Sequence, residues 1–166
     1  MEYQTRSPGN VVDDASVGTV AWSNPDNAKT SNDAYATTGN LNVVSHYLKA
    51  TNFGFSIPTG STINGIIVEI EKWEDISPFG GVKDSEVKVV KSDGTIGSTN
   101  KADTVTRWPT PDSDTYISSG TNNDLWGEVW TAEDINDIDF GAVLAAVGVP
   151  TGPATSYANV DHIQIT

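Results

Sequence analysis

Short runs of β-forming residues, separated by turn-forming residues, most constrain how this chain can fold. The clearest run is 63–73, in which Ile66, Val68 and Ile70 alternate with Ile67 and two glutamates. A period of two places one side of a strand in a core and leaves the other side partly in water. Further strands are expected at 34–38, 45–50, 52–57, 84–91, 115–118, 140–149 and 160–166. Many short strands joined by turns are typical of a β-sandwich or a jelly roll.

The chain has the length and composition of one such domain. Its 166 residues can bury a core without disulfides, and its five tryptophans argue against disorder. Thr131 followed by Asp134 resembles a capping box, although only about one helical turn fits before the apolar run 140–149. We therefore expect an all-β fold over residues 1–166: a single-domain β-sandwich, jelly-roll-like, with long loops and at most one short helical turn. Residues 1–20 are expected to include an extended N-terminal arm.

The strong negative charge excludes several classes of partner. The chain carries 22 acidic residues against 9 lysines and arginines, a net charge of −13. Nucleic acids and anionic membranes repel such a surface, so neither is expected as a direct partner. The absence of cysteine excludes disulfides, thiolate catalysis and cysteine-type zinc sites. No signal peptide or membrane-span pattern is recognisable, so a chain that starts at Met1 is expected to be made in the cytoplasm.

The sequence carries no recognisable catalytic constellation. Both histidines, His46 and His162, fall within predicted strands, where a structural role is commoner than catalysis. Glu69 and Glu71 share a strand face, but a solvated face explains them more simply than paired carboxylates for sugar hydrolysis. No Gly-x-Ser-x-Gly elbow, phosphate loop or His-Glu-x-x-His motif is present. We therefore expect no enzymatic activity and no organic cofactor.

One loop near the N-terminus is rich in the oxygen ligands that calcium prefers. Calcium binds six to eight oxygens from carboxylates, amides and backbone carbonyls. The candidate ligands are Asn24, Asp26, Asn27, Asn32 and Asp33. The same residue types also form turns through local side-chain to backbone hydrogen bonds, which need no ion. Turn formation is the favoured interpretation, and calcium is the one metal expected as an alternative.

Aromatic residues offer a second kind of candidate site. An exposed ring can stack on the flat apolar face of a sugar. Most tryptophans in a sandwich anchor the core or loops, and one or two of the five are expected to be exposed. Trp73 and Trp108 stand beside charged or turn-forming residues, and Tyr116 is a further candidate, so these three residues form the predicted glycan-binding set.

Several short blocks, taken in order, carry a family resemblance that covers most of the chain. The blocks are Trp22–Ala28, Asp33–Thr37, Tyr47–Pro58, Ile63–Ile70, Asp124–Gly127, Trp130–Asn136, Phe140–Gly141 and Val160–Ile165. Their order resembles a family of virion-associated β-sandwich structural proteins of tailed phages and prophages, of the capsid decoration or fibre type. The first block also loosely resembles a calcium-proximal loop of galactose-binding-like jelly rolls. The resemblance transfers no catalytic residue.

The phage resemblance implies a non-enzymatic structural protein on the exterior of the virion, a capsid (head) decoration or fibre protein. Its expected partners are the major capsid protein or other virion proteins. It is also expected to form a homo-oligomer, and a trimer would match the local three-fold positions of an icosahedral shell. Such a protein is made in the host cytoplasm and becomes extracellular after lysis, so it needs neither a signal peptide nor cysteines. The alternative function is a carbohydrate-binding adhesion module of a viral or bacterial surface protein.

Overall fold

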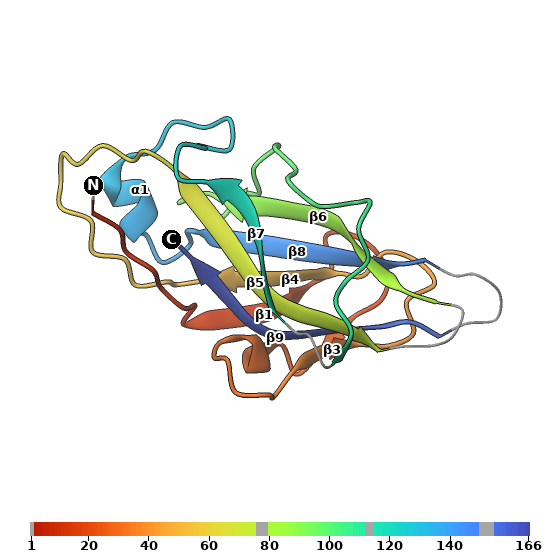
Figure 1. The fold of residues 1–166 in the computed structure, drawn as a ribbon. Helices are drawn as coiled ribbons and strands as arrows, with labels where there is room; N and C mark the ends of the chain where they lie inside the picture. The colour runs from red at the N-terminus through yellow and green to blue at the C-terminus, as the bar shows by residue number, and fades with distance from the viewer. Residues whose placement is uncertain (1, 76–79, 112–114, 150–154) are drawn as a thin grey trace.

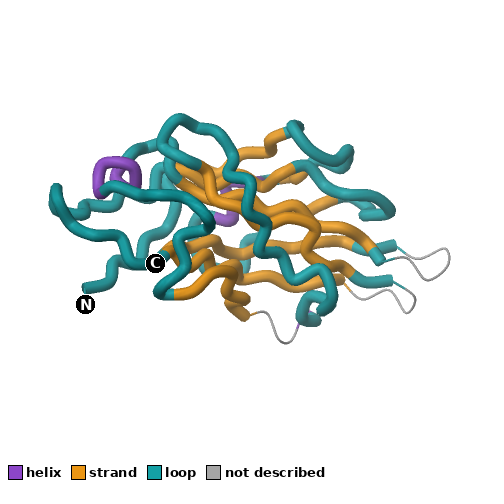
Figure 2. The backbone as a smooth tube through the Cα atoms, turned by 90° about the horizontal axis from the view of Figure 1, so that it is seen from above, coloured by secondary structure: helices purple, strands orange, loops and turns teal. Residues whose placement is uncertain are grey.

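The computed structural model describes residues 2–75, 80–111, 115–149 and 155–166, and over these ranges the chain forms two antiparallel sheets packed face to face (Figure 1). The four-stranded sheet has the order β1 (Asn10–Asp14), β4 (Tyr47–Thr51), β8 (Gly141–Gly148) and β6 (Val82–Val90). The five-stranded sheet has the order β2 (Trp22–Ser23), β3 (Ala36–Thr38), β9 (Tyr157–Ile165), β5 (Ile66–Asp75) and β7 (Thr115–Thr121). Figure 2 shows the strands running lengthwise, with long loops around them.

Successive strands alternate between the two sheets, which is the wrapping of a jelly roll. From β3 to β9, the odd-numbered strands belong to the five-stranded sheet and the even-numbered strands to the four-stranded sheet. The expected all-β, jelly-roll-like sandwich is therefore confirmed. No helix in the described part of the chain is long and apolar enough to cross a membrane.

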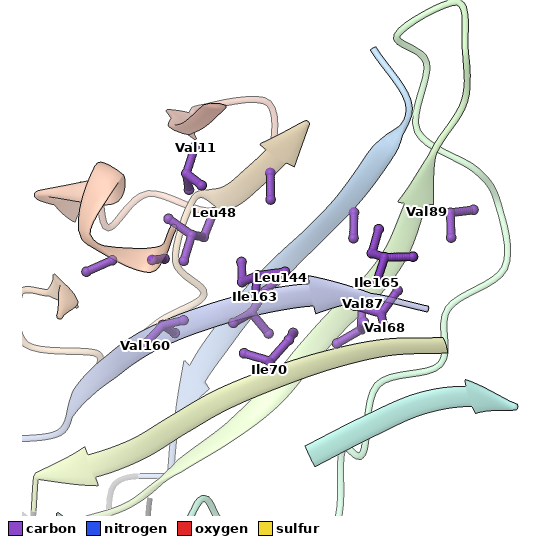
Figure 3. Close-up of a cluster of buried hydrophobic side chains, with 14 of the residues drawn as sticks. Val11, Leu48, Val68, Ile70, Val87, Val89, Leu144, Val160, Ile163 and Ile165 are labelled. Atoms are coloured by element: carbon purple, nitrogen blue, oxygen red, sulfur yellow. The ribbon is translucent and has the colours of Figure 1, made fainter. Parts of the chain in front are cut away.

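The hydrophobic core lies between the sheets and follows from the alternation in β5. Val68 and Ile70 are buried, while the residues between them are partly exposed, as the sequence predicts. Figure 3 shows Ile70 and Ile163 of the five-stranded sheet beside Leu144 of the four-stranded sheet, all in one buried cluster. Burial of such side chains stabilises the fold by about 1.5–3 kcal/mol each.

The segment 95–108 covers the free edge of β6. The backbone amides of Gly97, Lys101 and Trp108 donate to carbonyls of β6 at 2.9 Å each. These bonds occupy the edge of the four-stranded sheet, where unpaired backbone groups otherwise invite association. The side chain of Asn100 adds two bonds to β6, because it accepts the amide of Val87 at 3.0 Å and donates to the carbonyl of Ser85 at 3.1 Å.

Two corrections concern local structure. The expected strand at 52–57 is wrong: Asn52 and Gly54 have φ values of 59° and 62°, a left-handed conformation that interrupts an extended chain. Phe53 and Phe55 nevertheless share the core and stack with centroids 6.2 Å apart. Of residues 1–20, only the first part is an arm, because β1 begins at Asn10.

Two short helical turns flank the sandwich. The helix α1 (Ala132–Asn136) begins with the expected capping box, in which Thr131 and Asp134 bond each other's backbone amides. A 3₁₀ turn, η1 (Pro25–Ala28), is a second helical turn beside the one that the sequence predicts. Proline in the first turn of η1 lacks an amide that would have no partner there in any case.

Candidate functional site

A cavity of about 220 Å³ opens at the end of the sandwich where both termini lie (Figure 1). We call it the end pocket. Its floor belongs to the core, with buried side chains contributed by the sheets, by α1 and by the loop before β5. The floor residues are Phe55, Ile66, Ile135, Phe140 and Ile165. The wall is formed by the N-terminal arm at 2–4 and by the loop 55–65.

Two pairs of hydrogen bonds fix one end of the loop 55–65. Asn136 at the end of α1 accepts the amide of Ile57 at 2.7 Å and donates to its carbonyl at 2.9 Å. Gln4 of the arm donates to the carbonyl of Ser56 at 2.9 Å and accepts its amide at 3.2 Å. Each side-chain amide therefore forms a pair of bonds like those of a β-bridge, and Gln4 joins the arm to the loop.

The other end of the loop is anchored on the turn after β7. A Cβ atom at Gly65 would lie 2.3 Å from the backbone carbon of Asn122, so only glycine allows this close approach. The amide of Ile66 donates to the carbonyl of Asp124 at 2.9 Å. The arm is held in turn by two backbone bonds between Arg6 and Ile165, at 2.9 and 3.0 Å. The walls are thus fixed before any ligand binds, which lowers the entropy cost of binding.

The rim of the end pocket carries uncharged polar side chains. Ser61, Thr62, Asn64 and Asn122 are exposed lining residues, and none of their side chains makes a hydrogen bond to another described residue. Tyr3 also lines the pocket and is 60% exposed. An apolar floor below a few convergent polar groups is the usual composition of a small-molecule site.

The predicted glycan-binding residues lie elsewhere, and one of them is buried. Trp108 is 4% exposed, and its indole N–H donates to Asp84 at 2.8 Å. The expectation that its ring is exposed is therefore wrong, because the indole packs in the interior and bonds a buried carboxylate. Trp73 and Tyr116 are half-buried on the outer face of the five-stranded sheet. Their role in glycan binding stays a prediction.

The outer face of the five-stranded sheet is the second candidate region. The ring of Tyr35 meets Trp73 edge-on, with centroids 5.4 Å apart. Asn159 pairs with Trp73 in the register of β9 and β5. Three buried atoms have no hydrogen-bond partner among the described residues: Glu71 Oε2, Trp73 Nε1 and Asn159 Nδ2. Because all three atoms are covered, they do not offer a ligand direct contact in this conformation.

His162 stands in a row with a serine and a tyrosine. Its Nδ1 lies 2.7 Å from the Tyr116 hydroxyl and its Nε2 lies 2.9 Å from Ser7 Oγ. Burial lowers the pKa of His162. Burial, with the nearby charge of Glu71, raises the pKa of Tyr116 to about 12. A neutral tyrosine does not stabilise the imidazolium that a serine nucleophile requires, so the row works against catalysis and ties the arm to the sheet.

His46 has a comparable structural contact. Its Nδ1 lies 2.9 Å from a carboxylate oxygen of Asp13. The other oxygen of Asp13 accepts the backbone amide of Trp22 at 2.8 Å. This carboxylate therefore joins β1 to β2 and to the segment before β4, as expected of a histidine with a structural role.

Of the first three predicted calcium ligands, Asp26 and Asn27 have side-chain partners within the protein. Asn24 precedes η1 in a left-handed conformation with φ 53°. Asp26 forms an ion pair with Lys29 at 2.7 Å. Asn27 donates from its side chain to the carbonyl of Tyr35 at 3.0 Å. The first contact is an ion pair between side chains, and the second joins residues eight positions apart.

The remaining two candidate ligands are held by β9. Asp161 accepts the backbone amides of Asn32 and Asp33, at distances between 3.1 and 3.2 Å. The side chain of Asn32 accepts the amide of Ala34 at 3.1 Å. Within the described ranges, no three histidine or acidic side chains gather as a metal-binding group. Calcium binding at this loop stays a prediction.

The sequence alone did not point to the end pocket. Asn64 and Asn122 belong to different turns, and nothing in either turn indicates that they meet at one rim. The expected strand at 52–57 also concealed the loop that forms the wall. The available signal was the pair Phe53 and Phe55 beside a proline–glycine turn, which places a hydrophobic anchor next to an exposed loop.

Comparison with known proteins adds little that can be transferred. No protein-family model and no curated protein matches the chain. An exo-β-agarase structure has a TM-score of 0.46 at 6% identity, covering 96% of this chain and 23% of its own. TmCBM61, in complex with β-1,4-galactotriose, has a TM-score of 0.40 at 13% identity, covering 95% of this chain and 86% of its own. The CBM22-1 xylan-binding domain from Paenibacillus barcinonensis Xyn10C has a TM-score of 0.40 at 11% identity, covering 98% and 91%.

This chain therefore spans less than a quarter of the agarase chain. At TM-scores of 0.40 to 0.46, none of these proteins transfers its ligand or activity to this chain.

Proposed function

We propose that this protein is a non-enzymatic carbohydrate-binding module whose end pocket holds a sugar. The observation that carries the proposal is the apolar floor of the pocket below a rim of uncharged amides and hydroxyls. A sugar ring has apolar C–H faces and a surrounding set of hydroxyls, so it matches both parts of this lining. The exposed ring of Tyr3 adds a surface for stacking.

The proposed absence of catalysis is supported by the chemistry of the histidines. His162 is the residue closest to a catalytic arrangement, and both its lowered pKa and its neutral tyrosine partner disfavour proton abstraction from Ser7. Binding requires none of these groups.

The test is a glycan array probed with the wild-type chain and two variants. The double variant Asn64→Ala, Asn122→Ala removes two rim amides. We expect it to lower the affinity by about tenfold, because each lost hydrogen bond costs about 0.5–1.5 kcal/mol of binding free energy. Trp73→Ala is the matched control, because Trp73 lies about 23 Å along β5 from the pocket residue Ile66. Loss of binding in the Trp73 variant alone would move the site to the outer sheet face. Binding to no glycan would overturn the proposal.

Attachment to a phage particle is the second function that we propose, and it is compatible with the first. Its support is the order of sequence blocks that resembles virion-associated sandwich proteins. Within these blocks, Trp22, Trp126 and Trp130 are buried framework residues. The test is co-sedimentation of the purified chain with capsids of the phage or prophage that encodes it, together with light scattering. Co-sedimentation of a trimer supports this function, and a chain left in the supernatant contradicts it.

A further inference from the structure

We infer that the end pocket receives the terminal unit of a neutral glycan chain, end-on, instead of an internal unit or an acidic sugar. The inference rests on the proposed function and names the ligand class of the same site. Three properties of the pocket support it: its closed floor with fixed walls, its size and the charge around it.

The packed core closes the pocket from below, and contacts at both ends fix the loop that forms its wall. Its floor is the packed core, so a chain cannot pass through the molecule at Phe140, which is fully buried. Along the sides, the loop 55–65 is joined to the arm at Ser56 and to the turn after β7 at Gly65. An internal unit of a polysaccharide requires an exit on both sides, whereas a terminal unit requires only the mouth.

The size of the pocket fits a single unit. Its volume is about 220 Å³, below the range of about 300–1,000 Å³ that is usual for sites enclosing a whole drug-sized ligand. One sugar ring can therefore occupy the floor while the rest of the chain extends into solvent past the exposed ring of Tyr3.

The charge around the pocket disfavours an acidic sugar. Glu2 is the one charged residue among the described residues that line it, and no lysine or arginine joins it there. The net charge of −13 adds a repulsive field. Uncharged amides and hydroxyls at the rim bond sugar hydroxyls without requiring a charge on the ligand.

The first test is calorimetric titration of the full chain with mono- to hexasaccharides of β-1,4-linked glucose, galactose, mannose and xylose. If binding is end-on, the affinity for one oligosaccharide molecule should change by no more than about threefold from disaccharide to hexasaccharide, because only one sugar unit enters the pocket. An affinity that keeps rising with length beyond that factor overturns the inference but leaves carbohydrate binding intact. If the chain binds none of these oligosaccharides and no glycan on the array, both the proposed function and this inference are wrong.

The second test modifies the chain ends of the best binder. One derivative has its reducing end reduced to an alditol, and another has its non-reducing terminal unit methylated. We expect at least one modification to lower affinity by about tenfold, because the pocket bonds that unit's hydroxyls. Full affinity of both derivatives contradicts end-on binding.

The third test concerns charge. Oligosaccharides with a terminal uronic acid are expected to bind about tenfold more weakly at low salt than their neutral counterparts, with the gap narrowing as salt is added. Glu2→Gln is expected to narrow the difference in affinity between acidic and neutral sugars, because it removes the one charged side chain among the described lining residues. Equal or tighter binding of the acidic sugars overturns the neutral-ligand part of the inference.

Discussion

At the scale of single residues, a charged pair inside the sandwich is the least expected feature of the molecule. Lys72 lies on the inward face of β5, and its ammonium is 2.5 Å from a carboxylate oxygen of Asp84. The same oxygen accepts the indole N–H of Trp108, and the ammonium lies 4.8 Å from the centroid of that ring. Burial lowers the pKa of Lys72, while Asp84 opposes this shift. The pair holds β5, β6 and the segment 95–108 together.

Replacing one member of this pair is expected to destabilise the protein strongly. Lys72→Met leaves the carboxylate of Asp84 buried without its cation, at a cost of about 3–5 kcal/mol in the free energy of unfolding. Urea denaturation followed by tryptophan fluorescence measures this change. The double variant Lys72→Met, Asp84→Leu is the control, and it is expected to regain most of the loss because no charge stays buried. A loss below about 1 kcal/mol in the single variant would show that the pair is solvated.

The sequence could not predict this cluster from its alternation alone. Ile66, Val68 and Ile70 establish the inward face of β5, and the same period then assigns Lys72 inward against its chemistry. The buried ammonium of Lys72 is stabilised by two residues that are distant in the sequence, Asp84 and Trp108. The expected exposure of Trp108 was wrong for a related reason. Its sequence neighbours are polar, and Asp84, the buried residue that it bonds, is distant in the sequence.

At the scale of elements, the last residue of α1, Asn136, positions the wall of the end pocket, although its own side chain does not line the pocket. Asn136 fixes the backbone of Ile57 through two hydrogen bonds, whereas Ile135 contributes to the floor. The capping box at Thr131 in turn sets where α1 begins. Asn136 is therefore a positioning residue for the loop 55–65.

Asn136→Ala is expected to weaken sugar binding by about fivefold or more, and to lower the free energy of unfolding by about 1–2 kcal/mol, as two hydrogen bonds to the loop are lost. Thr131→Ala is the matched control, because it removes a cap of α1 worth about 1 kcal/mol and leaves the Asn136 bonds in place. Calorimetric titration and urea denaturation separate the two effects. Equal affinities of both variants would show that the loop needs no support from Asn136.

The elements that the sequence predicted best are those with a clear period. The expected strands 63–73, 84–91 and 160–166 correspond to β5, β6 and β9, with ends displaced by a few residues. The strand expected at 52–57 failed because left-handed residues alternate with phenylalanines there, which imitates a period of two. The end pocket depends on such loops, so its rim emerged only from the folded chain.

At the scale of the whole molecule, the many carboxylates determine how stability responds to acid. Backbone and hydroxyl donors of Thr106, followed by the amide of Val105, lower the pKa of Asp103 from 3.8 to about 2. Hydrogen bonds from Ser92 and Thr131 also lower the pKa of Asp134. Such groups stabilise the fold above their unfolded pKa, and this contribution disappears as pH falls through the folded pKa.

We therefore expect the free energy of unfolding to fall as pH decreases from about 4 towards 2, where these carboxylates take up protons. Urea midpoints measured across this range test the expectation. Asp103→Asn gives a shallower fall than wild type, because the asparagine does not titrate. A stability that stays constant or rises from pH 4 to pH 2 would contradict the assignment of these hydrogen bonds.

Sugar binding at the end pocket can be mapped by ¹H–¹⁵N correlation spectra of the labelled full chain, titrated with the strongest neutral binder from the array. We expect the largest chemical-shift changes at the amides of Tyr3, Asn64 and Asn122, while the amide signals of Trp73 and Tyr116 keep their chemical shifts. Shifts centred on Trp73 and Tyr116 would assign binding to the outer sheet face, and an unchanged spectrum at saturating sugar would contradict the carbohydrate-binding function.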